Sequence, residues 1–346
     1  MITGGAGFVG SHLGERLLGE GNRVIVLDNL STGKTSNISF AENDPRFDLV
    51  VGDVTDAPLV ERLTSFAETV FHLAAAVGVK LILADAIGSL KTNVAGAETV
   101  LEACTRQRTK ALIASTSEVY GKVARIPQRE DDDVLLGPTC YGRWSYAASK
   151  MLDEFIGLAY HRQGLPVVIF RLFNTVGPRQ SGRYGMVLPR FVSAALKGEA
   201  VPVYGDGTQS RCFLHVRDAV EALVRLERSP KAVGEVFNVG STEPVTIAEL
   251  ARRVLAAVDS RVSGRRVGTA AASPAEARIR YVPYGEAYPS GGFEEIGHRM
   301  PDITKIRGVT RWRPKRSLGE ILEDVVDERS LALEELREQV PVAALA

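Results

Sequence analysis

Short apolar runs alternate with amphipathic stretches through the first half of the chain. The apolar runs predict strands at 23–27, 47–51, 69–73, 110–115 and 165–172, because they are short and rich in β-branched residues. Three longer stretches, 8–18, 88–107 and 146–161, repeat apolar residues three or four positions apart and predict helices. Strands and helices that alternate at this spacing are typical of an α/β fold with a doubly wound parallel sheet.

The pattern changes after Phe173, where loops rich in Gly, Pro and Arg separate short helices predicted at 188–197, 216–227 and 247–257. The last helix begins with a capping box, because Glu249 lies three positions after Thr246. Residues 264–292 have weak periodicity and predict irregular structure. We expect a first domain over 1–173, a smaller mixed α/β lobe over 174–330 with some segments returning to the first domain, and a C-terminal tail over 331–346.

The composition is that of a globular protein without a nucleic-acid or membrane partner. In 346 residues, 42 Lys and Arg balance 42 Asp and Glu, so no positive excess is present to meet a phosphodiester backbone. No apolar run is long enough to span a bilayer, and no signal-peptide pattern is visible. The three cysteines and five histidines lack metal-ligand spacing, so we expect free thiols, no metal and a cytoplasmic location.

A glycine-rich turn follows the first three residues. Gly4, Gly7 and Gly10 lie between a first strand and a helix. Only three residues precede the glycines, so either the first strand is short or the chain starts further upstream. This spacing lets a backbone approach a dinucleotide pyrophosphate at the helix N-terminus. Asp28 ends the second strand, where a carboxylate accepts the ribose hydroxyls of NAD and disfavours NADP. Asp53 follows the third strand and is either an adenine contact or a helix N-cap.

A second motif carries the candidate chemistry. Tyr146 and Lys150 are four residues apart and share one face of a predicted helix. A lysine ammonium beside a phenol lowers the phenol pKa, so that the tyrosine becomes a usable base near neutrality. Thr116 ends a predicted strand, at the sheet edge where parallel α/β proteins bind ligands. We expect Thr116 to hydrogen-bond a reacting hydroxyl while Tyr146 removes its proton.

These residues give the chain a resemblance to a known family. The glycine turn, Asp28, the segment 115–121 and the Tyr146-x-x-x-Lys150 pair resemble the extended short-chain dehydrogenase/reductases, NAD-dependent enzymes that modify nucleotide sugars. The resemblance implies a Rossmann-type sheet that binds NAD, a UDP-linked sugar substrate, and a homodimer that pairs helices 88–107 and 145–161. It also implies cofactor contacts from Phe8, Val9, Asn29, Val54, Leu73, Ala74, Ala75 and Asn93, and substrate contacts from Asn174, Tyr204, Arg211 and Arg299.

Within that family, three features are similar to UDP-glucuronate decarboxylases. They are the carboxylate at Glu118, the run Arg143-Trp-Ser-Tyr146, and the run Gly297-His-Arg299. The resemblance implies active-site roles for Thr116, Ser117, Glu118, Tyr146, Lys150 and Arg299. It further implies that oxidation at the sugar C4 yields a ketone, which lets carbon dioxide leave. Hydride return then gives UDP-xylose, and slow return releases UDP-4-keto-pentose.

Other interpretations stay open. The decarboxylases carry a tyrosine in the loop after the fourth strand, whereas this chain has none there, and Lys80 is a replacement carboxylate partner or a surface residue. Glu118 also fits a 4,6-dehydratase, and Thr116 with Tyr146 suffices for a UDP-sugar 4-epimerase. An NAD-sensing regulatory protein is the non-enzymatic alternative. One further cluster lines a sugar or uracil pocket or lies in a solvated loop; it contains Arg183, Tyr184 and Arg190.

Overall fold

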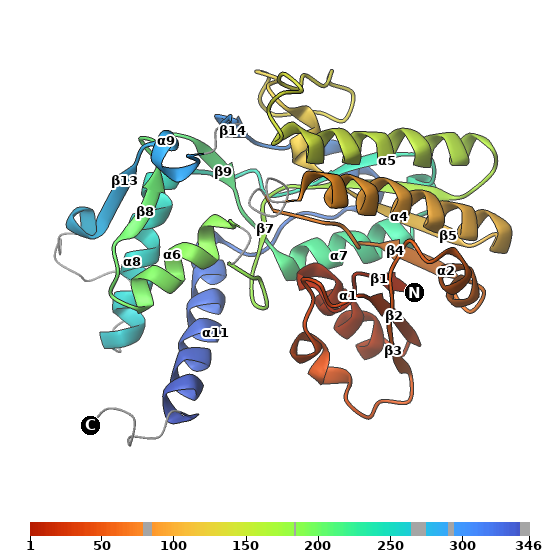
Figure 1. Cartoon of the computed structure of the whole chain (residues 1–346), viewed down its shortest axis with the longest axis horizontal. Helices are drawn as coiled ribbons and strands as arrows, with labels where there is room; N and C mark the ends of the chain where they lie inside the picture. The colour runs from red at the N-terminus through yellow and green to blue at the C-terminus, as the bar shows by residue number, and fades with distance from the viewer. Residues whose placement is uncertain (79–84, 183–184, 264–274, 290–293, 340–346) are drawn as a thin grey trace.

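A computed structural model gives the architecture of the whole chain (Figure 1) and describes residues 1–78, 85–182, 185–263, 275–289 and 294–339. In the first half, strands and helices alternate as the hydropathy pattern predicts. The strands are β1 (Ile2–Thr3), β2 (Val24–Asp28), β3 (Phe47–Val51), β4 (Thr69–His72), β5 (Lys110–Thr116) and β6 (Val167–Leu172). The helices are α1 (Phe8–Gly19), α2 (Ala57–Thr64), α4 (Ala86–Gln107) and α5 (Trp144–Arg162), with 3-10 turns η1 (Thr35–Ala41) and η2 (Ser117–Tyr120).

The second half contains shorter strands between helices. The strands are β7 (Thr175–Val176), β8 (Val201–Tyr204), β9 (Ser210–Cys212), β10 (Leu214–His215), β11 (Val236–Val239), β12 (Pro244–Thr246), β13 (Ile279–Val282) and β14 (His298–Arg299). The helices are α6 (Val187–Leu196), α7 (Val216–Glu227), α8 (Ile247–Ser263), α9 (Tyr284–Ala287), α10 (Thr304–Thr310) and α11 (Leu318–Gln339), with 3-10 turns η3 (Pro230–Ala232) and η4 (Ala275–Arg278). Half of the capping box of α8 forms, because the Glu249 N–H donates to Thr246 Oγ1 at 3.2 Å.

The large sheet has the strand order β11-β6-β5-β4-β1-β2-β3, and every neighbouring pair in it is parallel. The doubly wound α/β fold of Rossmann type is therefore confirmed. β1 has two residues, and it pairs with β2 on one side and β4 on the other. The direction of strand order reverses at β1, so the carboxyl ends of β1 and β4 frame the crevice where such sheets bind ligands.

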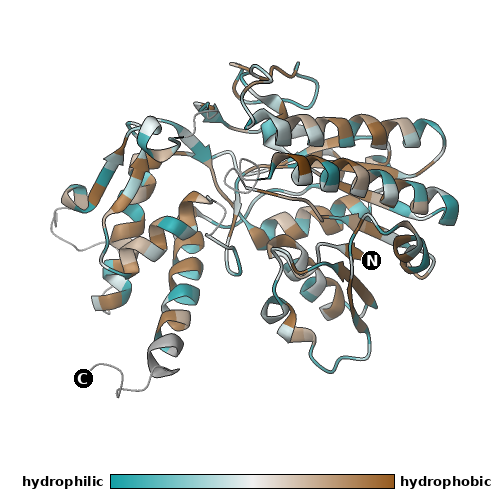
Figure 2. Ribbon diagram, viewed as in Figure 1, coloured by the Kyte–Doolittle hydropathy of each residue, from teal (hydrophilic) through white to brown (hydrophobic). Residues whose placement is uncertain are grey.

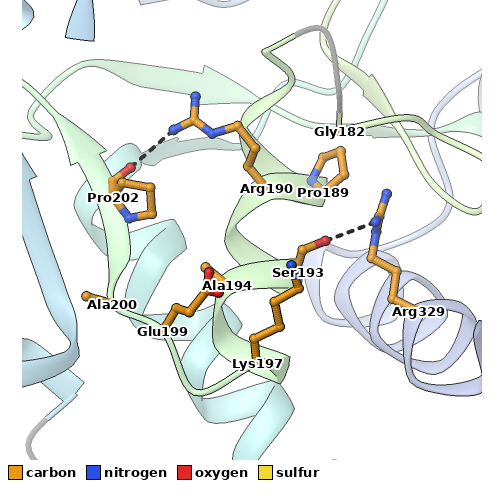
Figure 3. Close-up of a pocket in the computed structure, with 10 residues that line it drawn as sticks. All are labelled: Gly182, Pro189, Arg190, Ser193, Ala194, Lys197, Glu199, Ala200, Pro202 and Arg329. Carbon is orange, nitrogen blue, oxygen red and sulfur yellow. Dashed lines mark hydrogen bonds between the residues drawn. The ribbon is translucent and has the colours of Figure 1, made fainter. Parts of the chain in front are cut away.

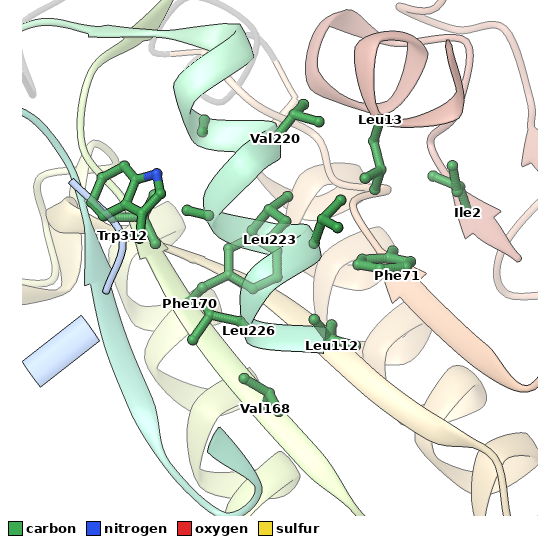
Figure 4. Packing of buried hydrophobic residues seen from close by; sticks show 14 of the residues in the cluster. Ile2, Leu13, Phe71, Leu112, Val168, Phe170, Val220, Leu223, Leu226 and Trp312 are labelled. Atoms are coloured by element: carbon green, nitrogen blue, oxygen red, sulfur yellow. The ribbon is translucent and has the colours of Figure 1, made fainter. Parts of the chain in front are cut away.

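Both faces of the sheet are covered. Alternate residues of a strand point to opposite faces, and β6 serves two clusters in this way. Val168 and Phe170 pack with Trp312 and residues of α1 and α7 (Figure 4). Val167 and Ile169 pack on the other face, with residues of α2, α4 and α5. In Figure 2 the strands of this sheet are largely brown, the colour of hydrophobic residues.

A second lobe lies at the left of Figure 1, where α6, α8 and α11 pack around a separate apolar cluster. Its strands pair in small groups: β12-β9-β14, β13 with β8, and β10 with β7. Two later segments instead join the large sheet lobe, because β11 extends the sheet and α7 packs against α1. Residues 331–339 continue α11.

The expectation of irregular structure over 264–292 is wrong for its described part. β13 pairs in parallel with β8, from Ile279 opposite Val201 to Val282 opposite Tyr204, and α9 follows. The strand has only four residues and its partner lies far away in sequence, so the local pattern is too short to reveal it. Among the described helices, none is both long and apolar enough to cross a membrane.

Candidate active site

The turn after β1 is built closely against the loop after β4. Gly4 has a positive φ of 71°, and a Cβ there would lie 2.8 Å from the backbone nitrogen of Ala74. A Cβ on Gly10 would overlap the carbonyl oxygen of Gly4, so the first turn of α1 packs directly on the glycine turn. Gly7 is the N-cap of α1 and supplies no side-chain cap. The N–H groups that open α1, at Phe8 and Val9, therefore form an anion site of the kind that holds a pyrophosphate.

Asp28 lies beside this turn at the end of β2. Its Oδ2 accepts the Ala6 N–H at 2.9 Å, and its Oδ1 accepts the Leu30 N–H at 2.8 Å. A carboxylate offers about four lone-pair positions, so each oxygen retains capacity for a ribose hydroxyl. The side chain is buried against the glycine turn, next to Gly33. The donor set at the crevice thus fits a dinucleotide: N–H groups for phosphate and a carboxylate for ribose.

Asp53 is tied to the same edge of the sheet. It accepts hydrogen bonds from the Thr55 N–H and hydroxyl, and from Asn29 Nδ2 at 2.9 Å. These bonds, that of the Thr55 hydroxyl above all, lower the pKa of Asp53. The N-cap interpretation of Asp53 is wrong, because Asp56 caps α2 by accepting the Leu59 N–H. The side chain of Val54, in contrast, is buried in the core.

A buried chain of hydrogen bonds joins the crevice to α5. The Leu73 N–H donates to the Thr3 carbonyl, which sets the loop that continues through Ala74 and Ala75 beside the glycine turn. Asn93 Oδ1 then accepts the Ala76 N–H at 2.8 Å, and Asn93 Nδ2 donates to Ser149 Oγ at 3.1 Å. Ser149 in turn donates to the Tyr146 carbonyl at 2.8 Å. Asn93 thereby fixes α5 relative to this loop.

Thr116 and Tyr146 lie together, as the sequence predicts. Thr116 closes β5, where its Oγ1 accepts the Glu118 N–H at 3.2 Å, and it hydrogen-bonds the phenol of Tyr146. Burial, followed by the negative charges of Glu118 and Asp153, raises the pKa of Tyr146, and the Thr116 bond opposes this.

Lys150 is paired with a carboxylate, so its effect on the pKa of that phenol stays a prediction. Its ammonium donates to Asp153 Oδ2 at 2.7 Å, and both side chains are almost fully buried. The adjacent carboxylate offsets the charge of the lysine, so the phenol does not feel an isolated cation.

Glu118 lies between two guanidinium groups. Arg299 Nη1 is 3.6 Å from Glu118 Oε1 and donates to Ser117 Oγ at 3.3 Å, and Arg143 Nη2 is 3.9 Å from Glu118 Oε2. Burial, and then the nearby charge of Arg211, lower the pKa of Arg299 to about 10. The elements β5, η2, α5 and β14 thus bring together five predicted catalytic residues: Thr116, Ser117, Glu118, Tyr146 and Arg299.

Arg211 connects this cluster to the second lobe. It is buried on β9, where its Nη1 donates to the carbonyls of Ser210 and Gly297 at 2.8 and 3.0 Å, and its Nη2 pairs with Glu295. β14 pairs with β9 and places Arg299 opposite Arg211 in register. Asn174 binds the same strand less closely, through the Cys212 carbonyl at 3.4 Å.

Arg190 and Tyr204 form a separate pair on α6 and β8. The Arg190 guanidinium lies 4.4 Å from the centre of the Tyr204 ring. Arg190 also lines a cavity of about 410 Å³ between α6, β8 and α11 (Figure 3), together with Ser193, Lys197 and Arg329. Thr116 and Tyr146 do not line that cavity. Lys80, Arg183 and Tyr184 lie outside the described residues.

Three residues of the site were not singled out for a role in the sequence: Arg143, Asp153 and Glu295. Arg143 precedes α5 and stacks over the Trp144 ring at 5.0 Å, and only its burial distinguishes it from a surface arginine. Asp153 lies three residues after Lys150, a spacing that also describes ordinary exposed ion pairs. Within the described residues, no three His, Cys, Asp or Glu side chains are placed to hold a metal ion.

Comparisons with known proteins agree with this geometry. The model of the NAD dependent epimerase/dehydratase family matches residues 1–240. UDP-N-acetyl-alpha-D-glucosaminuronate decarboxylase of Bacillus cytotoxicus is 40% identical over 328 residues, which cover 94% of this chain and 96% of that protein. UDP-glucuronic acid decarboxylase 1 of Arabidopsis thaliana is 36% identical over 329 residues, covering 95% and 69% respectively.

A solved structure extends the similarity to the fold. DesIV of Streptomyces venezuelae, a dTDP-glucose 4,6-dehydratase with NAD bound, aligns with a TM-score of 0.81 and 28% identity, covering 96% of this chain and 97% of that one. The sheet order, the glycine turn and the Tyr146–Lys150 helix all belong to the region that the family model matches. The chain belongs to the NAD dependent epimerase/dehydratase family.

Proposed function

We propose that this protein decarboxylates a UDP-linked hexuronic acid, and UDP-glucuronate in particular, after transient oxidation at C4 of the sugar. One observation carries the proposal: a proton-transfer pair, Thr116 and Tyr146, adjoins a carboxylate held between two arginines at Glu118. The products are UDP-4-keto-pentose and, after reduction, UDP-xylose.

We place the cofactor in the crevice beside β1, β2 and α1, because the backbone N–H groups and the carboxylate there suit a dinucleotide. Gly4, Gly7 and Gly10 let the backbone approach the pyrophosphate, and the N-terminus of α1 offers it N–H donors. Asp28 would accept hydrogen bonds from the ribose hydroxyls, and Asn29 and Asp53 would lie near the adenine. NAD, when bound, supplies the hydride acceptor for C4 and the hydride donor for the return step.

The first step is proton removal. Tyr146 Oη, as phenolate, takes the proton of the sugar 4-hydroxyl, while the Thr116 hydroxyl donates a hydrogen bond to the same sugar oxygen. Lys150, anchored on Asp153, keeps two further N–H donors for the groups around it. Tyr146 is partly buried, which limits the access of water to this proton transfer.

The second step is the loss of carbon dioxide. A C4 ketone is β to the carboxylate on C5, so the electrons of the breaking C5–C6 bond delocalise into an enolate. Thr116 and Tyr146 donate hydrogen bonds to the enolate oxygen. We assign the substrate carboxylate to the side of the site that carries Arg143 and Arg299, because guanidinium groups match a carboxylate in shape and charge. Arg299 either holds the diphosphate or delivers a proton to C5.

A 4,6-dehydratase and a 4-epimerase are the alternatives within the family. Both act on a sugar that needs no carboxylate, whereas the guanidinium groups on either side of Glu118 match one. The two decarboxylase relatives, at 40% and 36% identity, support the same choice. The more similar of them is named for a 2-acetamido hexuronate, so the UDP-linked 2-acetamido sugar acid is our second candidate substrate.

The test is product analysis by mass spectrometry and NMR with purified protein and NAD. The panel contains UDP-glucuronate, UDP-N-acetylglucosaminuronate, UDP-glucose and dTDP-glucose. We expect loss of carbon dioxide from a uronate and no reaction with UDP-glucose, which has a hydroxymethyl group where UDP-glucuronate has the carboxylate. Loss of water from dTDP-glucose, or interconversion of UDP-glucose with its C4 epimer, would refute the proposal.

We further propose a homodimer. α4 and α5 lie side by side on the surface of the large lobe, and four of their apolar side chains are exposed: Ile87, Leu90, Leu152 and Phe155. Two copies related by a two-fold axis would bury these side chains against one another.

We also propose that the two parts of the chain bind different ligands. Residues 1–173, with β11 and α7, hold NAD, and the lobe formed mainly by 174–330 holds the nucleotide sugar through Arg211, Asn174 and Tyr204. A cytoplasmic location agrees with the three free cysteines, two of which, Cys104 and Cys212, are buried.

A further inference from the structure

A buried carboxylate lies one helical turn beyond Lys150. Asp153 has no exposed surface, and its Oδ2 accepts the Lys150 ammonium at 2.7 Å. The three-residue spacing keeps both side chains on one face of α5. The other carboxylate oxygen, Oδ1, is buried without a hydrogen-bond partner among the described residues. Among the described residues, Lys150 is therefore the group that holds this carboxylate in place.

The charged groups around the pair do not share this task. On β4, His72 is kept neutral, because burial and then the charge of Lys150 lower its pKa to about 3. On α5, Glu154 is engaged elsewhere, with Arg171 of β6 at 2.7 Å and with Ser115 of β5. On η2, Glu118 faces the two arginines, Arg143 and Arg299. Asp153 is the carboxylate that balances Lys150.

We propose that Asp153 is a positioning residue that anchors the Lys150 ammonium, offsets its charge, and so sets the pH at which Tyr146 becomes a base. The proposal rests on the proposed function, in which Tyr146 removes the proton of the 4-hydroxyl.

The physical argument has two parts. An ammonium has three N–H donors, and the bond to Asp153 fixes one of them and directs the other two. The carboxylate also cancels much of the positive potential that an unpaired lysine would exert on the phenol one turn away, because charges interact strongly in a poorly hydrated interior. In support, Asp153 is one of the groups that raise the pKa of Tyr146.

The decisive variant is Asp153→Asn, which keeps the shape and removes the charge. In the NAD-loaded protein with tyrosines labelled by carbon-13 at Cζ, the Tyr146 resonance is assigned by its loss in Tyr146→Phe. We expect Asp153→Asn to lower the pKa of Tyr146 by about one unit. The acid limb of the pH profile of kcat/KM moves to lower pH by the same amount, because the base is used in its deprotonated form.

Glu154→Gln is the matched control, since it removes the next carboxylate on the same helix, whose charge Arg171 already neutralises. It should leave the Tyr146 resonance nearly unmoved. Asp153→Ser repeats the charge removal with a smaller side chain if the asparagine variant does not fold. A Tyr146 resonance that titrates at the same pH in the Asp153 variants as in the wild type overturns the role of Asp153 alone. A resonance that moves while the acid limb of turnover stays overturns Tyr146 as the base.

Discussion

The phenol of Tyr146 and the hydroxyl of Thr116 are the pair on which the chemistry depends at the scale of single residues. Both were expected from the sequence, because a strand end and a helix face can be located from hydropathy alone. The charges around these two side chains could not be predicted from the sequence. Whether Lys150 meets Asp153 or the phenol is decided by side-chain packing inside the folded protein, and no spacing rule distinguishes these outcomes. The same holds for Arg143 and Glu295, which differ from surface residues only in their folded surroundings.

Tyr146→Phe tests the proton-transfer pair. Only the acceptor oxygen is lost, so kcat should fall by about 10²- to 10⁴-fold while NAD stays bound. Turnover measured by product formation and NAD binding measured by calorimetry check the two halves. Tyr160→Phe, on the same helix, is the control and should keep normal turnover. Near-normal turnover in Tyr146→Phe would mean that another group is the base.

Glu118→Gln tests the carboxylate between the arginines. The change keeps the shape and removes the charge that faces Arg143 and Arg299. We expect kcat for carbon dioxide release to fall by about 10²-fold, because the two guanidinium groups lose the partner that orients them. Stopped assays of carbon dioxide and UDP-sugar give the rate. An unchanged rate of carbon dioxide release would exclude Glu118 from the reaction.

At the scale of elements, α4 and α5 are the scaffold of the site. Their positions were predictable because their apolar positions recur over five turns or so, whereas strands such as β13 and β14 have two to four residues and pair with distant segments. Asn93 on α4 and Ser149 on α5 join the two helices to the loop after β4. The resemblance implied that Asn93 contacts the cofactor. In the structure, its side chain hydrogen-bonds Ala76 and Ser149.

Ser149→Ala tests this connection. The variant removes the acceptor of Asn93 Nδ2 and the donor to the Tyr146 carbonyl. We expect a loss of about 1–3 kcal/mol in the free energy of unfolding, because Asn93 keeps a buried donor without a partner. Urea unfolding of Ser149→Ala, Asn93→Ala and the double variant gives the coupling free energy between the two side chains. Strictly additive losses would contradict a direct bond between the two side chains.

His12 makes the joint between α1 and the loop at Pro178 sensitive to pH. Its Nε2 lies 3.0 Å from the Pro178 carbonyl, and burial above all lowers the pKa of His12 from 6.5 to about 4. The pKa of His12 is lower in the folded protein than in the unfolded chain, so its contribution to the free energy of unfolding is complete above about pH 6.5. This contribution is lost as the pH falls toward 4. Thermal unfolding at a series of pH values should therefore show a falling Tm in this window. His12→Gln should give a flatter profile, and an identical slope would contradict the assignment.

At the scale of the whole molecule, the fold class followed from the alternation of strands and helices. The expected division into lobes followed from the loops rich in Gly, Pro and Arg that begin after Phe173. The sequence did not show where β11 and α7 belong, because their return to the large sheet is a long-range pairing. The site also joins distant segments, because Arg299 of β14 contacts Ser117 and Glu118 of η2.

Phe155→Glu tests the assembly. Phe155 is 61% exposed on α5 beside Leu152, and a buried charge there would oppose pairing of two copies. We expect light scattering to show a dimer for the wild type and a monomer for the variant at micromolar concentration. Phe66→Glu is the matched control, because Phe66 is 72% exposed and lies outside α4 and α5. A wild type that is monomeric, or a Phe155→Glu variant that stays dimeric, would contradict the proposed interface.

The most direct test of the account follows carbon dioxide from UDP-glucuronate labelled in the carboxyl group, with NAD-loaded wild type and Tyr146→Phe compared side by side. The account predicts one labelled carbon dioxide for each substrate consumed by the wild type, and almost none from the variant. Consumption of UDP-glucuronate with the label retained in the sugar, or equal release by both proteins, would contradict it.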